Sequence, residues 1–136
     1  MKAYTDREQS KKLAEILPVE SADHHYVRKV TDFMGNPVDG EWSHPKYGNP
    51  NSKYANYMVQ NFTSYETIPC WSLAALLDML NYPTLAHEFC GSEKEKWVLS
   101  IYDPEETYRV WENNPIDACY KMILKLPMNL IYCDYD

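Results

Sequence analysis

The sequence predicts an α+β fold, with three helices and a small, mainly antiparallel sheet. Three stretches lead to this prediction: a nearly all-apolar run over residues 69–81, an alternating pattern around a turn over 96–111, and a helix-start signal at Asn114. The chain has 136 residues, 45% of them hydrophobic, which is enough for a core without metal ions or disulfides. We therefore expect residues 1–136 to form a single globular domain.

The apolar run predicts a central helix over residues 69–81 that is buried on several sides. A helix that is apolar nearly all round has no face to offer to water. Pro69 suits the first helical position, where its missing N–H costs nothing, and Asn81 suits the end. We expect Leu76 and Leu77 on this helix to be almost fully buried.

Two further helices are predicted near the ends of the chain. Thr5 and Glu8 fit a capping box at the start of the first helix, and Pro18 fits its end. Asn114 as N-cap and Pro115 at the first helical position open the other helix. The side chains that we expect in its buried stripe are Ile116, Tyr120, Ile123 and Leu124.

The clearest strand signal is a hairpin made of residues 96–102 and 107–111. Alternate residues of its first strand share one apolar face by period two. The members of that face are Trp97, Leu99 and Ile101. Pro104 suits the second position of a type I turn between the strands. A weaker strand signal covers residues 25–30, and the tail over 128–136 fits an edge strand as well as a loose end.

A long loop rich in aromatic and asparagine residues is predicted from about residue 32 to 65. Tyr and Trp offer large, rigid contact area, and Asn, Ser and Gly offer adaptable hydrogen bonding, which is the mixture that recognition loops use. The residues that we expect to bind a protein partner are Trp42, Tyr47 and Tyr54. In the alternative interpretation, Tyr57 and Phe62 pack the loop onto the body, and its other side chains form solvated surface.

The net charge and the hydropathy of the chain argue against some classes of binding partner. The net charge of −7 and the low isoelectric point, near 5.0, argue against nucleic-acid binding through a broad basic surface. No apolar run reaches membrane-spanning length, and the N-terminus lacks the apolar stretch of a signal peptide. We expect a cytoplasmic protein with an unknown protein partner, no membrane contact and no cofactor.

Cys70 followed by Trp71 is the strongest chemical signal, because a helix N-terminus favours a thiolate. Papain-like proteases and transglutaminases place a Cys–Trp pair at such a position. Their chemistry also needs a His to activate the thiol, usually from a downstream strand. The predicted downstream hairpin contains no His. A buried structural Cys70 is therefore the favoured interpretation, with a cysteine-dependent hydrolase or transglutaminase-like enzyme as the alternative.

Metal binding is not expected from the histidine and cysteine pattern. His24 and His25 are adjacent, so on a strand their side chains point to opposite faces and rarely share one metal. The four cysteines form no C-x-x-C pair, and no second ligand cluster has zinc-like spacing. The cysteine pattern favours a reducing compartment over a disulfide framework.

Three segments together resemble a family of small uncharacterised proteins of gut Bacteroides-type bacteria, often carried on prophages or other mobile elements. They are residues 8–18 with 20–23, 69–76 and 114–120. The resemblance implies no activity and no catalytic residue, but it favours an accessory role on a mobile element over housekeeping metabolism. The sequence thus predicts a non-enzymatic protein-interaction module, with the enzyme based on Cys70 as the alternative.

Overall fold

The computed structural model describes residues 1–50, 62–89 and 95–131. The chain divides into two compact units. We call Asp6–Trp71 the N-terminal unit, and Met1–Thr5 together with Ser72–Asp136 the C-terminal unit.

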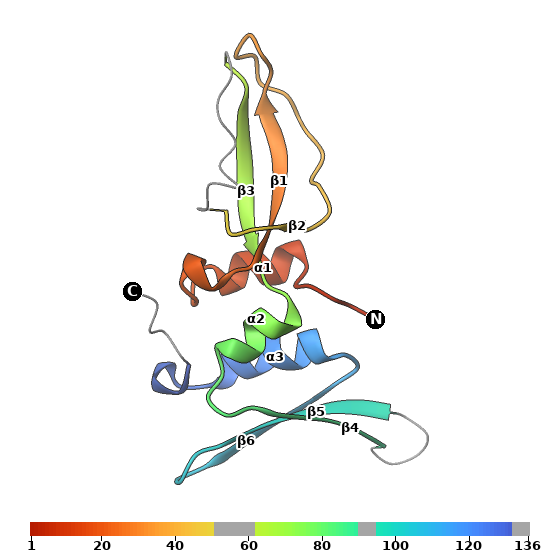
Figure 1. Ribbon diagram of the computed structural model, residues 1–136, viewed down its shortest axis with the longest axis vertical. Helices are drawn as coiled ribbons and strands as arrows, with labels where there is room; N and C mark the ends of the chain where they lie inside the picture. The colour runs from red at the N-terminus through yellow and green to blue at the C-terminus, as the bar shows by residue number, and fades with distance from the viewer. Residues whose placement is uncertain (51–61, 90–94, 132–136) are drawn as a thin grey trace. The chain divides into compact units, whose positions relative to one another are not determined.

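The N-terminal unit is built on a three-stranded antiparallel sheet with the order β2-β1-β3. Its strands are β1 (His24–Thr31), β2 (Lys46–Tyr47) and β3 (Ser64–Cys70), and its helix is α1 (Arg7–Leu13). Figure 1 shows β1 and β3 running side by side. Their register pairs His24 with Cys70 and has one irregularity near Thr31. α1 packs against β3.

The cap of α1 lies one residue later than the sequence predicted. The Asp6 carboxylate accepts a hydrogen bond from the backbone N–H of Gln9 at 2.8 Å, and the Gln9 side chain accepts one from the Asp6 N–H at 3.1 Å. The capping box is therefore Asp6–Gln9, and the predicted pair of Thr5 and Glu8 is wrong. Thr5 is fully buried instead, and Asp caps a helix as well as Thr does, so the pattern alone did not separate the two positions.

Residues 38–43, which lie in the long loop predicted over 32–65, are more regular than that prediction. Backbone N–H groups of Val38, Gly40 and Ser43 donate to carbonyls of β1 at 3.0, 3.2 and 2.9 Å, respectively. Gly40 is required there, because a Cβ at this position would lie 2.4 Å from the carbonyl oxygen of Lys29. The segment therefore follows β1 closely before β2 forms; residues 51–61 lie outside the described range.

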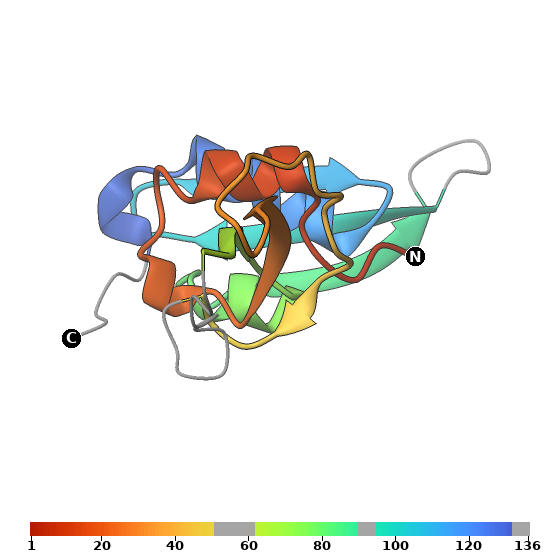
Figure 2. The same ribbon diagram turned by 90° about the horizontal axis from the view of Figure 1, so that it is seen from above.

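The C-terminal unit contains a second three-stranded antiparallel sheet, with the order β4-β5-β6, and two helices. The strands are β4 (Thr84–Phe89), β5 (Glu95–Tyr102) and β6 (Thr107–Glu112), and the helices are α2 (Leu73–Asp78) and α3 (Pro115–Lys125). α3 packs on β5 and β6, and α2 packs on α3. Figure 1 shows α3 on one face of this sheet, and Figure 2 shows the strands lying alongside one another.

The predicted hairpin is confirmed. β5 and β6 pair antiparallel from Trp97 with Glu112 to Tyr102 with Thr107. Leu99 and Ile101 are buried, as the period-two pattern requires. Trp97 is half-buried and stacks on the ring of His87, with 4.5 Å between the ring centroids.

The predicted central buried helix over 69–81, with a single small sheet around it, is wrong. The first part of the apolar run completes β3, where Pro69 pairs with His25 on an edge strand that tolerates a missing N–H. α2 then begins after Ser72, whose side chain accepts a hydrogen bond from the N–H of Ala75, and it is only six residues long. A short apolar run fits a strand and a helix equally, so it cannot separate the two.

In α2 and α3, some side chains are buried as predicted and others are not. Leu76 is fully buried, but Leu77 is only half-buried. α3 begins as predicted, with the Asn114 side chain accepting from the N–H of Asp117 at 2.9 Å. Its buried face holds Ile116, Ala118, Cys119, Met122 and Ile123, whereas Tyr120 is half-buried and Leu124 is exposed. The tail is described as far as Ile131, which forms an antiparallel bridge with Leu80.

Candidate functional site

Trp42, the first of the predicted binding residues, is engaged inside its own unit. The guanidinium of Arg28 lies 4.9 Å from its ring centroid, and that of Arg7 lies 5.9 Å away. Arg28 is itself held by Glu66, with Nε and Nη2 at 2.9 and 2.8 Å from one carboxylate oxygen, and Asp39 lies 3.7 Å from its Nη1. We call these five residues the Trp42 cluster. The charged groups of this cluster and the ring of Trp42 largely contact one another.

Tyr47 is 81% exposed, the larger exposure of the two predicted binding residues that the structure describes. Its ring meets that of His24 edge to face, with centroids 5.6 Å apart. Tyr54 and Tyr57 lie outside the described residues, so the predicted three-residue surface is seen only in part. Phe62 is exposed, which differs from the packed position that the alternative interpretation gave it.

The strand register places a histidine from an upstream strand opposite Cys70, whereas the activating His of cysteine-dependent hydrolases usually comes from a downstream strand. His24 is the cross-strand partner of Cys70, and its Nδ1 lies 3.0 Å from a carboxylate oxygen of Asp23. Cys70 is nevertheless fully buried, and the Tyr26 hydroxyl hydrogen-bonds to it. Burial, together with this thiol, raises the pKa of Tyr26. A sulfur without solvent exposure is not accessible to a substrate, so these residues form part of a core.

The described residues also bear on the predictions about metal ions and membranes. In residues 1–50, 62–89 and 95–131, no three side chains of His, Cys, Asp or Glu are grouped so that they could hold a metal ion. Among the same residues, no helix is both long and apolar enough to cross a membrane.

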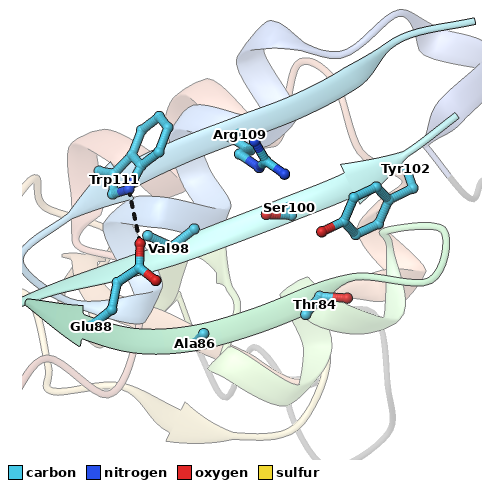
Figure 3. Close-up of a pocket in the computed structure, with 8 residues that line it drawn as sticks. All are labelled: Thr84, Ala86, Glu88, Val98, Ser100, Tyr102, Arg109 and Trp111. Atoms are coloured by element: carbon cyan, nitrogen blue, oxygen red, sulfur yellow. Dashed lines mark hydrogen bonds between the residues drawn. The ribbon is translucent and has the colours of Figure 1, made fainter. Parts of the chain in front are cut away.

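A shallow depression of about 270 Å³ lies on the face of the sheet β4-β5-β6 that Figure 3 displays. All three strands contribute to it. We call it the sheet depression, and its lining residues are Thr84, Ala86, Glu88, Val98, Ser100, Tyr102, Arg109 and Trp111. The strand register aligns them in rows across the sheet, so that Ser100 pairs with Thr84 on one side and with Arg109 on the other.

The floor of the sheet depression is closed and its rim is aromatic. Val98 and Ser100, on the middle strand, are only 7% and 4% exposed. Trp111 and Tyr102 stand at opposite ends and are 48% and 58% exposed. The indole N–H of Trp111 donates to the Glu88 carboxylate at 3.4 Å, which links the two edge strands above the middle one.

Among the described residues that line the sheet depression, Arg109 is the only basic one. Its backbone carbonyl accepts a hydrogen bond from Lys125 of α3 at 3.3 Å. Figure 3 shows its side chain, like that of Tyr102, directed toward Ser100. Among the residues that the structure describes, its guanidinium has no hydrogen bond or ion pair. Five N–H donors in a plane are thus presented beside two aromatic rings.

The sheet depression combines polar, charged and aromatic side chains. Its eight described lining residues supply hydroxyls, one carboxylate, one guanidinium and aromatic area, but neither a thiol nor an imidazole. Tyr102, Arg109 and Trp111 were not predicted as binding residues, because the sequence prediction for the hairpin rested on its apolar face alone. Period two places these residues together on the other face, which is the signal that was available.

The chain was compared with protein-family models, with curated proteins and with solved structures, and none of the three comparisons gave a match.

Proposed function

We propose that this chain is a non-enzymatic protein-interaction module that binds its partner on the sheet depression. The observation that carries the proposal is the pair of half-exposed aromatic side chains, Tyr102 and Trp111, flanking an arginine over a closed floor. Trp, Tyr and Arg are the residues most enriched at the energetic centres of protein interfaces. A sheet whose other face carries α3 offers such residues on a rigid support.

The cellular setting is proposed from composition and resemblance. Cys70 and Cys119, the two cysteines that the structure describes, are buried thiols outside any disulfide, which fits a reducing compartment, so we propose that the protein acts in the cytoplasm. The resemblance of its segments to proteins of prophages and mobile elements supports an accessory role on such an element. The net charge of −7 favours a protein partner over a nucleic acid.

A second surface remains proposed for the same function, centred on Trp42 and Tyr47 and, outside the described residues, Tyr54. The exposure of Tyr47 favours it, whereas the partners of Trp42 weigh against it. One observation supports the alternative of a cysteine-dependent hydrolase: His24 lies opposite Cys70. The full burial of the Cys70 sulfur argues against it.

The test of the function is affinity capture from the native host with the full-length chain as bait, followed by mass spectrometry. We expect the wild-type chain and Tyr47→Ala to retain a captured protein that Trp111→Ala and Tyr102→Ala lose. Each variant is first checked for an unchanged circular dichroism spectrum. A protein retained by Trp111→Ala and lost by Tyr47→Ala would instead assign binding to the second surface, and hydrolysis of a captured protein would contradict a non-enzymatic role.

A further inference from the structure

The charge of Arg109 defines the chemistry that the sheet depression recognises; this inference rests on the proposed function. The chain carries 20 acidic and 13 basic residues, so carboxylates are plentiful. Arg28 uses two of them, Glu66 and Asp39. Arg109, in contrast, has no ion pair among the described residues. A guanidinium left open between aromatic side chains on an acidic protein is complementary to an anionic group on another molecule.

We infer that the sheet depression binds an acidic peptide segment of a partner protein, with a carboxylate on Arg109 and an adjoining apolar side chain between Tyr102 and Trp111. The planar guanidinium matches a carboxylate with two parallel hydrogen bonds. The hydroxyls of Ser100 and Thr84 lie in the same row across the sheet, in register with Arg109. They can donate to further oxygen atoms of the bound segment.

The same residues argue against a polyanion. The described lining residues include a single guanidinium, and the Glu88 carboxylate stands at the Trp111 end of the depression, where it repels a second negative charge. At about 270 Å³, the space lies just below the range of about 300–1,000 Å³ that small-molecule sites occupy, and it suits one or two protein side chains. The Trp111 and Tyr102 rings offer the apolar contact that a peptide side chain requires.

The position of Arg109 is set by the fold rather than by a loop. It lies on β6, its cross-strand neighbour is Ser100, and Lys125 of α3 holds its carbonyl. A side chain on a paired strand loses little further freedom of its backbone on binding, which favours specific recognition. Its guanidinium has no hydrogen bond or ion pair with any described residue, so we expect a change of this side chain to leave the structure intact.

The experiment uses the purified full-length chain and a bead-displayed library of random octapeptides. We expect peptides selected by the wild-type chain to be enriched in Asp or Glu beside an apolar residue. Arg109→Gln should lose this enrichment, and Arg109→Glu should select Lys or Arg instead. Lys12→Gln, which removes an exposed positive charge from the N-terminal unit, is the matched control and should select the same peptides as the wild type.

One selected peptide then gives the quantitative test by fluorescence anisotropy. Replacing its acidic residue by the amide, or Arg109 by Gln, should each weaken binding by on the order of tenfold, and the two changes together should cost little more than either alone. No acidic enrichment, or affinities that are independent of Arg109, would overturn the inference. Acetate binding at Arg109 as tightly as the peptide would also overturn it, since the site would then be one for small carboxylates.

Failure of this inference and failure of the proposed function give different results. Capture of a protein that depends on Trp111 but not on Arg109 would leave the interaction module in place and remove only the acidic ligand. Capture of a protein that depends on neither Trp111 nor Arg109 would exclude the sheet depression as the binding surface.

Discussion

In each unit an arginine lies close to a tryptophan. The two pairs differ in the residue that lies opposite the arginine on the neighbouring strand. In the N-terminal unit, Arg28 lies over Trp42 and is bound by Glu66, its cross-strand neighbour on β3. In the C-terminal unit, Arg109 lies beside Trp111, but its cross-strand neighbour is Ser100. The carboxylate opposite the first arginine forms an ion pair with it, whereas the second arginine faces a hydroxyl and has no ion pair among the described residues.

The comparison teaches that residue type alone does not identify a binding surface. Trp42 sits in a segment whose composition is typical of recognition loops, yet its ring is already partnered. Trp111 sits in an ordinary strand, yet it is half-exposed on the rim of a depression. What separates them is which residue the strand register places opposite each arginine.

The largest effect is expected from the cores of the two units. Leu13 in the N-terminal unit and Leu76 in the C-terminal unit are both fully buried, so Leu13→Ala and Leu76→Ala should each lower the free energy of unfolding by about 2–5 kcal/mol. If residues 1–136 form a single cooperative domain, both variants shift the same urea transition. Two separate transitions would show that the units unfold independently, and a loss below about 0.5 kcal/mol would contradict the described core.

The buried thiol of the C-terminal unit gives a pH-dependent effect. Burial raises the pKa of Cys119 from 9.0 to about 12. Above pH 9 the unfolded chain loses this proton while the folded chain keeps it, so the stability from the neutral buried thiol is present below pH 9 and lost as pH rises toward 12. The expected slope is about 1.4 kcal/mol per pH unit.

The measurement is urea unfolding of the wild type and of Cys119→Ala at pH 8 and pH 10. The variant should be less sensitive to this change of pH than the wild type. Tyr26 of the N-terminal unit, whose pKa burial also raises, is common to both proteins and cancels in the difference. Equal sensitivity would mean that Cys119 is not held neutral by burial.

The two tryptophans should respond oppositely to truncation. Trp111→Ala is expected to weaken partner binding by more than about 1 kcal/mol while leaving the melting temperature nearly unchanged. Trp42→Ala should lower stability by about 0.5–1 kcal/mol, through loss of its cation–π contact with Arg28. Isothermal titration with the captured partner and thermal unfolding measure the two quantities, and the reverse pattern would assign binding to the Trp42 cluster.

A smaller difference is expected between the two arginines. Arg28→Gln removes an ion pair with Glu66 that is partly exposed, and should lower the free energy of unfolding by about 0.2–1 kcal/mol, less at high salt. Arg109→Gln should not change it measurably. Stability measured in 0.05 M and 0.5 M salt separates the two, and a salt-dependent loss for Arg109→Gln would reveal a partner that closes its site.

The smallest expected effect is at Cys70, where we predict no reaction. Iodoacetamide should modify this buried thiol in the native protein no faster than a free cysteine at neutral pH. Mass spectrometry of tryptic peptides reads out the rate, with the urea-unfolded chain as the control for reactivity. Fast native labelling that His24→Gln abolishes would favour the hydrolase alternative.

The elements that the sequence predicted well are those set by local chemistry. The hairpin rests on period two and on a turn around Pro104, and the start of α3 rests on Asn114 and Pro115, so each signal lies within a few residues of its effect. The run after Pro69 failed because its apolar residues serve β3 first and α2 afterwards, and neighbouring residues do not show where one ends.

The candidate site depends on which strands pair and in what register. A single sequence does not show these non-local pairings. Arg109 is open because Ser100 is its neighbour and α3 lies on the other face of the sheet. His24 meets Cys70 only through the register of β1 with β3, across many residues of chain. Alternation along β5 and β6 indicated two faces, but not which of them the helix covers.

Binding on the sheet depression is the central claim, and the indole N–H groups of the four tryptophans test it most directly. In ¹H–¹⁵N spectra of the full-length chain, addition of the captured partner should shift or broaden the Trp111 signal. The signal of Trp71, a buried residue whose indole donates to Ser21 at 2.9 Å, should remain unchanged as an internal control. A shift of the Trp42 signal with an unchanged Trp111 signal would contradict the claim and assign binding to the N-terminal unit.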